Sequence, residues 1–196
     1  MASTLSTMLP LGTPLPEFTL PDVVSGKLIT PETFKDSTAL VVMFICRHCP
    51  YVKHVEDELP RLAKDYAAQR VGFVAITSND AENYPEDSPE SSAEMAKELG
   101  FTFPFCYDED QLVAQAFQAA CTPEFYLFDS ARRLAYRGQL DDSRRSNSIP
   151  VTGKDLRAAI DAVLAGAPVS QNQIPSIGCN IKWKPGNEPA YLNLTT

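Results

Sequence analysis

The stretch that decides the fold is ALVVMFICRHCP, residues 39–50. Its first seven residues are all apolar, which is typical of a strand buried on both faces in a mostly parallel sheet. Cys46 and Cys49 follow this strand at once. After Pro50, apolar side chains recur three and four residues apart, which predicts a helix; they are Val52, Val55, Leu59, Leu62 and Tyr66. The two thiols are therefore expected where a buried strand ends and a helix begins.

Further elements are predicted on both sides of this stretch. Two short runs flanking Ser25-Gly26 predict a β-hairpin near the N-terminus. Strands are expected at residues 71–77, 101–107, 125–128 and 134–140, and helices from Pro89 to Gly100 and at residues 111–120 and 154–164. Pro60 is expected to kink the helix that follows Pro50, because it lacks a backbone donor and clashes with the preceding turn.

This order of elements predicts an α/β fold with a central mixed sheet flanked by helices. A βαβ half is followed by a ββα half, with an inserted segment at about residues 79–110 between them. Covering both faces of the sheet with helices is the economical way to bury it. We expect one domain at residues 9–167 and an extended, proline-rich tail at residues 168–196 that packs on it.

Charge is distributed unevenly along the 196 residues. The formal net charge is -8, which makes binding of nucleic acid through a basic face an unfavoured function. Between Asp80 and Asp110 there are ten acidic residues and one basic residue, Lys97, so the inserted segment accounts for the whole excess. The remainder is nearly neutral, and from the sequence we expect the acidity to have little influence on the chemistry at Cys46.

The N-terminal sequence and the cysteine count predict a compartment. The first residues, MASTLSTMLPLGTPLP, have no basic segment and no apolar run typical of a signal peptide. No stretch approaches the ~18 apolar residues of a membrane span. Five cysteines do not form an even disulfide framework. We therefore expect a cytoplasmic, reducing location, in which a close pair of cysteines indicates redox chemistry or metal binding.

Cys46-Arg47-His48-Cys49 is the main functional signal. Thiols at i and i+3 can close a short disulfide ring, and the first is expected at a helix N-terminus, where the macrodipole stabilises a thiolate. Arg47 and His48 add positive potential. The thiolate is the nucleophile of disulfide exchange, and the second thiol then resolves the mixed disulfide. The alternative interpretation is two reduced cysteines that merely pack in the core.

Thr122-Pro123 lies directly before the strand expected at residues 125–128. Together with the Cys-x-x-Cys, it resembles the thioredoxin superfamily, and the hairpin and insert resemble its redoxin branch of alkyl hydroperoxide reductase/thiol-specific antioxidant and TlpA-like proteins. A peroxiredoxin-like thioredoxin family is resembled more narrowly over residues 9–184, in the segments CRHCPYVKH, CTPEFYLFD, YRGQLDD, PVTGKDLRAAIDAVLAG and GCNIKWK.

The resemblance implies Cys46 as nucleophile, Cys49 as resolving thiol and Pro123 as a cis-proline facing them. Arg47, His48, Pro50 and Thr122 are then supporting residues.

The sequence also departs from these relatives. It has no Pro-x-x-x-Thr-x-x-Cys pattern, which makes efficient peroxide reduction unexpected. Arg47-His48 replaces the Gly-Pro of thioredoxin, and a His directly before the second Cys is similar to the strongly oxidising periplasmic disulfide donor. His48 is therefore expected to stabilise the Cys46 thiolate and raise the reduction potential. Thioredoxin has a buried carboxylate under its thiols, and the run ALVVMFI offers none.

The remaining cysteines are open to two interpretations each. Cys121, two residues before Pro123, is either a third redox thiol or a small packing residue. Cys179 is either placed over the site by the tail or is a buried inert thiol. Cys106, within an aromatic strand, is expected in the core.

The sequence thus predicts a thiol-disulfide oxidoreductase without an organic cofactor. Its expected partners are protein thiols and disulfides, with a thioredoxin or glutathione system as electron donor. A peroxiredoxin-like thiol peroxidase is the second enzyme hypothesis. The competing class is a copper or zinc carrier, since Cys46, His48, Cys49 and His54 lie within nine residues and thiolate with imidazole suits these metals. For His54 alone, a solvated position on a helix is favoured.

Overall fold

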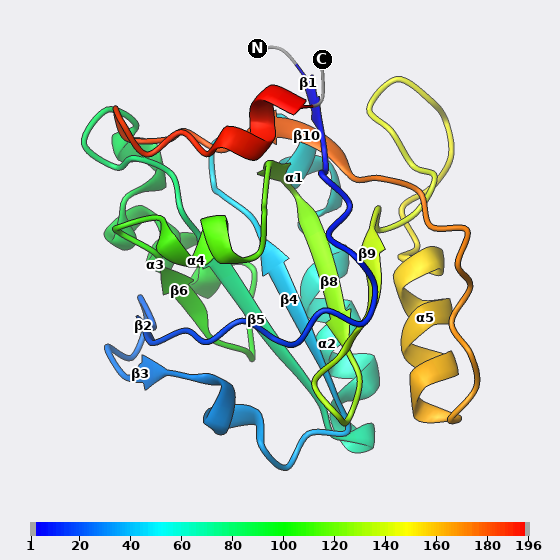
Figure 1. Cartoon of the computed structure of the whole chain (residues 1–196). Helices are drawn as coiled ribbons and strands as arrows, with labels where there is room; N and C mark the ends of the chain where they lie inside the picture. Colours follow the sequence, from blue (N-terminus) through cyan, green and yellow to red (C-terminus); the bar gives the residue numbers. More distant parts are fainter. Residues whose placement is uncertain (1–2, 195–196) are drawn as a thin grey trace.

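The computed structural model describes residues 3–194, and its centre is a five-stranded mixed sheet. The strand order is β6-β5-β4-β8-β9, as Figure 1 shows. β4 (Ala39–Phe44), β5 (Val71–Thr77) and β6 (Phe105–Tyr107) run parallel, whereas β8 (Glu124–Phe128) is antiparallel to both β4 and β9 (Leu134–Gly138). The predicted α/β class with a mixed sheet is confirmed. β4 is central and fully buried, as its unbroken apolar run requires.

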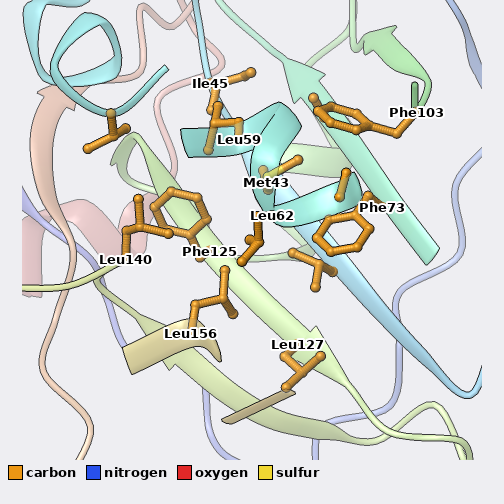
Figure 2. Packing of buried hydrophobic residues seen from close by; sticks show 14 of the residues in the cluster. Met43, Ile45, Leu59, Leu62, Phe73, Phe103, Phe125, Leu127, Leu140 and Leu156 are labelled. Carbon is orange, nitrogen blue, oxygen red and sulfur yellow. The ribbon is translucent and has the colours of Figure 1, made fainter. Parts of the chain in front are cut away.

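One face of the sheet packs against four helices, of which α1 (Pro50–Val55) contributes Val52 and Val55 to the core. α2 (Glu58–Tyr66) and α5 (Lys154–Leu164) contribute Leu59, Leu62 and Leu156 to the core, and α3 (Pro89–Glu98) packs at its edge. Figure 2 shows Met43 of β4 and Ile45, which directly follows this strand, on this face, together with Phe125 and Leu127 of β8. Alternate residues of each strand therefore fill this layer.

The opposite face is covered mainly by the N-terminal part of the chain. The short hairpin of β2 (Leu20–Pro21) and β3 (Leu28–Ile29) is confirmed, and α4 (Leu112–Ala116) closes the layer beside it. The rings of Phe44, Phe117, Tyr126 and Phe128 meet there edge to face, with centroids 5.4–6.0 Å apart. This face is thus sealed by aromatic packing under loops and one short helix.

The helix after Pro50 is interrupted, in agreement with the kink predicted at Pro60. It is divided into α1 (Pro50–Val55) and α2 at residues 56–57, because Pro60 has no N–H for the carbonyl of Glu56. Two other predicted boundaries are wrong for local reasons. The strand expected at residues 101–107 pairs only from Phe105, directly after Pro104. The helix expected at residues 111–120 ends early, since Gln118 adopts a left-handed φ of 50°.

The C-terminal tail contributes the central strand of a second, three-stranded sheet. β10 (Ile177–Asn180) lies between β1 (Ser3–Leu5) and β7 (Cys121–Thr122), antiparallel to both. After α5 the chain runs back along that helix to reach this position, next to α1 (Figure 1). The tail strand thereby covers the end of the central sheet at which Cys46 and Cys49 lie.

Replacing Phe117 tests the aromatic face of the core. Phe117 is fully buried against three other rings, so Phe117→Ala should lower the free energy of unfolding by about 3–5 kcal/mol. Leu112, at the start of α4, is 59% exposed, and Leu112→Ala should change stability by less than about 0.5 kcal/mol. Urea denaturation measures both. Equal effects of the two substitutions would contradict the packing described here.

Candidate active site

The two thiols of the Cys-x-x-Cys meet the Thr122–Pro123 segment. The Thr122–Pro123 peptide bond is cis. Cys46 Sγ lies 3.3 Å from Thr122 Oγ1, and Cys49 Sγ lies 3.2 Å from the Thr122 carbonyl oxygen. Pro50 follows as the first residue of α1. Residues far apart in sequence are therefore brought together at the carboxyl end of β4, and both cysteines are free thiols.

Cys49, and not Cys46, stands at the start of the helix. Cys49 is the residue that precedes α1, whereas Cys46 lies in the turn between β4 and α1. The sequence-based prediction that the helix start favours the first thiol is therefore wrong. The side chains of Cys46 and Cys49 are 1% and 0% exposed, so both sulfur atoms are removed from water in this conformation.

The thiols of Cys46 and Cys49 share a hydrogen bond, and their ionisation is coupled. The pKa of Cys49 is lowered to about 4, first because Cys46 donates to it; Cys179, Thr122 and the backbone of Val52 contribute as well. The pKa of Cys46 is raised, because its hydrogen bond to Cys49, its burial and the charge of Asp87 all disfavour a second negative charge. The shared hydrogen bond therefore makes the first proton of the pair easier to lose and the second harder.

Arg47 and His48 are both engaged by the acidic insert. The guanidinium of Arg47 lies 2.8 Å from a carboxylate oxygen of Glu94 and 3.0 Å from one of Glu98, both on α3. His48 donates its backbone N–H to Asp87 at 3.0 Å, and its Nδ1 makes a short contact to the other carboxylate oxygen. The expectation that the acidity has little influence on the chemistry is wrong, since carboxylates of the insert bind both Arg47 and His48, the two residues between the thiols.

Asn79 links Asp87, the carboxylate that contacts His48, to the C-terminal tail. The amide of Asn79 donates to Asp87 at 2.7 Å, and its carbonyl accepts the backbone N–H of Lys182 at 2.8 Å. Lys182 is further fixed through its carbonyl, which accepts from Asp80 N at 2.8 Å and from Gln111 Nε2 at 2.9 Å. The position of the tail is thus tied to the residues beside Cys46.

Cys179 and Cys121 also lie at this end of the molecule. Cys179 pairs in register with Thr122, and its thiol is hydrogen-bonded to Cys49. Cys121 is fully buried, with its sulfur 3.9 Å from a carboxylate oxygen of Glu124, and burial raises its pKa. Cys106 belongs to the core layer on the other face of the sheet, away from these thiols.

Glu124 is a buried carboxyl group that the sequence analysis missed. It accepts hydrogen bonds from the backbone of Ala120 at 2.9 Å and of Cys121 at 3.3 Å, and from Tyr126 Oη at 2.8 Å. Burial raises its pKa to about 7. A Glu directly after a predicted cis-proline, at the entrance to a buried strand, was the available signal. The carboxyl group lies next to Cys121, and not in direct contact with Cys46 or Cys49.

The structure also separates the two histidines. His54 lies in the last turn of α1, where its Nε2 is 2.7 Å from Ser143 Oγ, whereas the ring of His48 contacts Asp87. Among residues 3–194, one group of side chains is arranged to hold a metal ion: donor atoms of Cys46, His48 and Asp87 lie within 4.8 Å of one another. His54 does not belong to it.

The arrangement defines the class of protein. A mixed sheet of order β6-β5-β4-β8-β9 carries a Cys-x-x-Cys after its central strand and a cis-proline before the neighbouring antiparallel strand. This is the architecture of the thioredoxin-like oxidoreductases. A family model described as Redoxin matches residues 10–156, so the chain belongs to the Redoxin family.

Solved structures extend this comparison. The chain is 57% identical to an uncharacterized conserved protein from Geobacillus kaustophilus, with a TM-score of 0.93 and coverage of 95% of this chain and 98% of that one. It is 50% identical to a hypothetical protein from Sinorhizobium meliloti 1021, with a TM-score of 0.91 and coverage of 93% and 100%.

A more distant structure shares the fold alone. It is a thiol:disulfide interchange protein of the thioredoxin family from Chlorobium tepidum TLS, at 17% identity and a TM-score of 0.61, with coverage of 80% and 99%. Comparison with curated proteins gave no match. In residues 3–194, every helix is too short or too polar to cross a lipid bilayer.

The raised pKa of Glu124 predicts a pH-dependent stability. Its native pKa of about 7 exceeds the ordinary value of 4.5, so the protonated form favours folding. The stabilisation is present below about pH 4.5 and is lost as the pH rises through 7, by about 3 kcal/mol in total. Glu124→Gln, which stays neutral, should remove this dependence. Urea denaturation of both proteins across that range measures it, and a difference in stability that does not vary with pH would refute the assignment.

Proposed function

We propose that this protein is a thiol-disulfide oxidoreductase that acts through Cys46 and Cys49. The observation that carries the proposal is the pair of hydrogen-bonded free thiols held against Thr122. In the reductive direction, the Cys46 thiolate attacks a disulfide of a partner and displaces one partner thiolate, which takes up a proton. Cys49 then attacks the Cys46 sulfur of the mixed disulfide and displaces the second partner thiolate. Two electrons pass to the partner, and the Cys46–Cys49 disulfide remains.

The hydrogen bonds to Cys49 support these roles. When an external thiol attacks the oxidised pair at Cys46, Cys46 has no proton to donate, but the thiol of Cys179 and the backbone of Val52 still stabilise Cys49 as the leaving thiolate. By microscopic reversibility, Cys49 is the thiolate that resolves the mixed disulfide. The higher pKa of Cys46 gives it the greater intrinsic nucleophilicity once the proton has moved across the shared hydrogen bond.

The proposed partners are protein thiols and disulfides, with a thioredoxin or glutathione system as electron donor in a cytoplasmic setting. The thiols carry the electrons themselves, so the reaction requires no organic cofactor. Both sulfur atoms are buried, and that of Cys49 contacts Cys179 of β10, so we expect a protein partner to reach the pair only when the tail strand is displaced. Because a protein needs more room than a small molecule to reach the buried sulfur atoms, we expect protein disulfides to react more slowly than small disulfides.

The peroxidase hypothesis has less support. Peroxiredoxins hold the peroxide with an arginine, and the guanidinium next to Cys46 is already engaged by Glu94, Glu98 and the carbonyl of Ser91. We therefore do not propose peroxide reduction as the activity.

Metal binding is the second candidate function. The donor atoms of Cys46, His48 and Asp87 are close enough to bind one ion, and Cys49 lies beside Cys46. A set of thiolate, imidazole and carboxylate ligands suits zinc. Metal analysis of the purified protein separates the two functions. A carrier should retain stoichiometric zinc or copper and lose it in Cys46→Ser, whereas an oxidoreductase should contain none.

Substitution of each thiol tests the proposed exchange reaction. Cys46→Ser should abolish the catalysed reduction of a protein disulfide by dithiothreitol, because the sulfur that bonds to the partner is lost. Cys49→Ser should form a mixed disulfide with the partner and accumulate it, because the resolving thiol is missing. Mass spectrometry identifies the trapped adduct.

Cys106→Ser is the matched control, since Cys106 lies on the other face of the sheet. It should retain full activity. Full activity of Cys46→Ser would exclude the proposed function, and trapping by Cys46→Ser in place of Cys49→Ser would reverse the two roles.

A further inference from the structure

Three thiols converge on one peptide group of β7. Thr122 contacts Cys46 through its hydroxyl group and Cys49 through its carbonyl oxygen, and Cys179 is its partner in the β10–β7 ladder. The thiol of Cys179 is hydrogen-bonded to that of Cys49. Cys179 is 1% exposed and belongs to the same buried cluster as the other two. Cys49 is thus flanked by a thiol on each side.

We propose that Cys179 is a third redox thiol, which receives the disulfide from the Cys46–Cys49 pair and so forms a Cys49–Cys179 disulfide between α1 and the tail. This inference rests on the proposed exchange function and adds a step to it. The tail strand β10 then serves both as the cover of the site and as its internal reaction partner.

The proposed step is an isomerisation with no net transfer of electrons. The sulfur of Cys179, as a thiolate, attacks Cys49 Sγ of the Cys46–Cys49 disulfide. The bond between Cys49 and Cys179 forms, the bond between Cys46 and Cys49 breaks, and Cys46 leaves as a thiolate. The proton lost by Cys179 ends on Cys46, so the products are one disulfide and one thiol, as before.

The tail is built to hold Cys179 in this position. A Cβ atom on Gly178 would lie 1.9 Å from the Thr122 carbonyl oxygen, so β10 approaches Thr122 this closely only because residue 178 has no side chain. On the other side of Cys179, the backbone of Ile181 donates to Ala120 at 3.1 Å and Lys182 is fixed by Asn79. Cys179 is therefore anchored on both sides against the strand that contacts the thiol pair.

The electrostatics make the step conditional on oxidation of the pair. In the reduced protein, burial raises the pKa of Cys179 to about 12, together with its hydrogen bond to Cys49 and the charge of that sulfur. The last two causes vanish when Cys49 enters a disulfide, because it then carries no charge. Lys182, which favours the thiolate of Cys179, remains. Cys179 therefore becomes a better nucleophile only after Cys46 and Cys49 have reacted.

The result of the step is a division of roles among the three sulfur atoms. The disulfide moves to Cys49 and Cys179, and Cys46 returns to the thiol form. Cys46 can then bond to a second partner disulfide and displace one partner thiolate, while the first partner has already received both electrons. Release of the second partner needs a further thiol, because Cys49 and Cys179 are joined, so the Cys49–Cys179 disulfide must be reduced before that exchange is complete. A two-cysteine site, by contrast, has no thiol left to bond to a second partner until it is reduced.

Disulfide mapping of Cys46→Ser tests the proposal directly. The full-length variant is oxidised with diamide under native conditions, free thiols are alkylated, and tryptic peptides are identified by mass spectrometry. Cys49 lies in residues 48–53 and Cys179 in residues 158–182, so their disulfide joins two distinct peptides. Arg47 separates Cys46 from Cys49, which makes the same map informative for the wild-type protein.

The expected product in Cys46→Ser is the Cys49–Cys179 disulfide, with Cys106 and Cys121 alkylated. Cys46→Ser/Cys179→Ser should leave Cys49 free, and Cys46→Ser/Cys106→Ser should behave as Cys46→Ser does. In oxidised wild-type protein, both the Cys46–Cys49 and the Cys49–Cys179 peptides should appear. Gly178→Ala, which moves β10 away from Thr122, should reduce the second product and leave the first.

The inference is overturned if Cys49 and Cys179 both stay free in folded, diamide-treated Cys46→Ser while wild-type protein forms the Cys46–Cys49 disulfide. It is also overturned if Cys49 pairs with Cys121 in place of Cys179. Failure of the proposed function has a different signature, because wild-type protein then neither forms the Cys46–Cys49 disulfide nor catalyses exchange. Circular dichroism of each variant before oxidation establishes that the comparison is made on folded protein.

Discussion

The contact on which the candidate site depends is the close approach of two segments to the peptide group of Thr122. The carbonyl oxygen of Thr122 receives the thiol of Cys49 from one side and packs against the Cα atom of Gly178 from the other. β7 has only two residues, so it could not hold the tail by length alone. The missing side chain at residue 178 lets β10 pair with it, and that pairing removes three thiols from water and lets their ionisation depend on one another.

The acidic insert belongs to this arrangement as well. Its carboxylates neutralise Arg47 through Glu94 and Glu98, and Asp87 orients His48 while it disfavours a thiolate on Cys46. Part of the negative net charge of the chain therefore lies close to Arg47 and His48, the two residues between the cysteines. Since Asn79 joins Asp87 to the backbone of Lys182, the insert also helps to place the tail.

Patterns that depend on local sequence could be predicted, and contacts between distant segments could not. The unbroken apolar run of β4 and the helical spacing after Pro50 identified the sheet and the position of the thiols, because burial imposes these periodicities. The resemblance supplied the cis-proline. The pairing of Cys179 with Thr122 and the contacts of Asp87 depend on how the tail and the insert fold back, which no periodicity encodes. The unequal acidity of the two thiols arises first from the hydrogen bond between Cys46 and Cys49, and the contacts with Cys179 and Asp87 add to it.

The closed conformation also constrains which reaction can occur first after oxidation. While β10 is in place, external thiols are excluded from a Cys46–Cys49 disulfide, and Cys179 is the thiol held in contact with Cys49. A reaction between groups held in contact has an effective concentration far above that of any dissolved thiol. The internal exchange therefore competes with strand opening, and only opening admits a partner. A mobile tail would expose the pair to any thiol, whereas the anchors at Gly178 and Lys182 make access to the disulfide depend on the displacement of one strand.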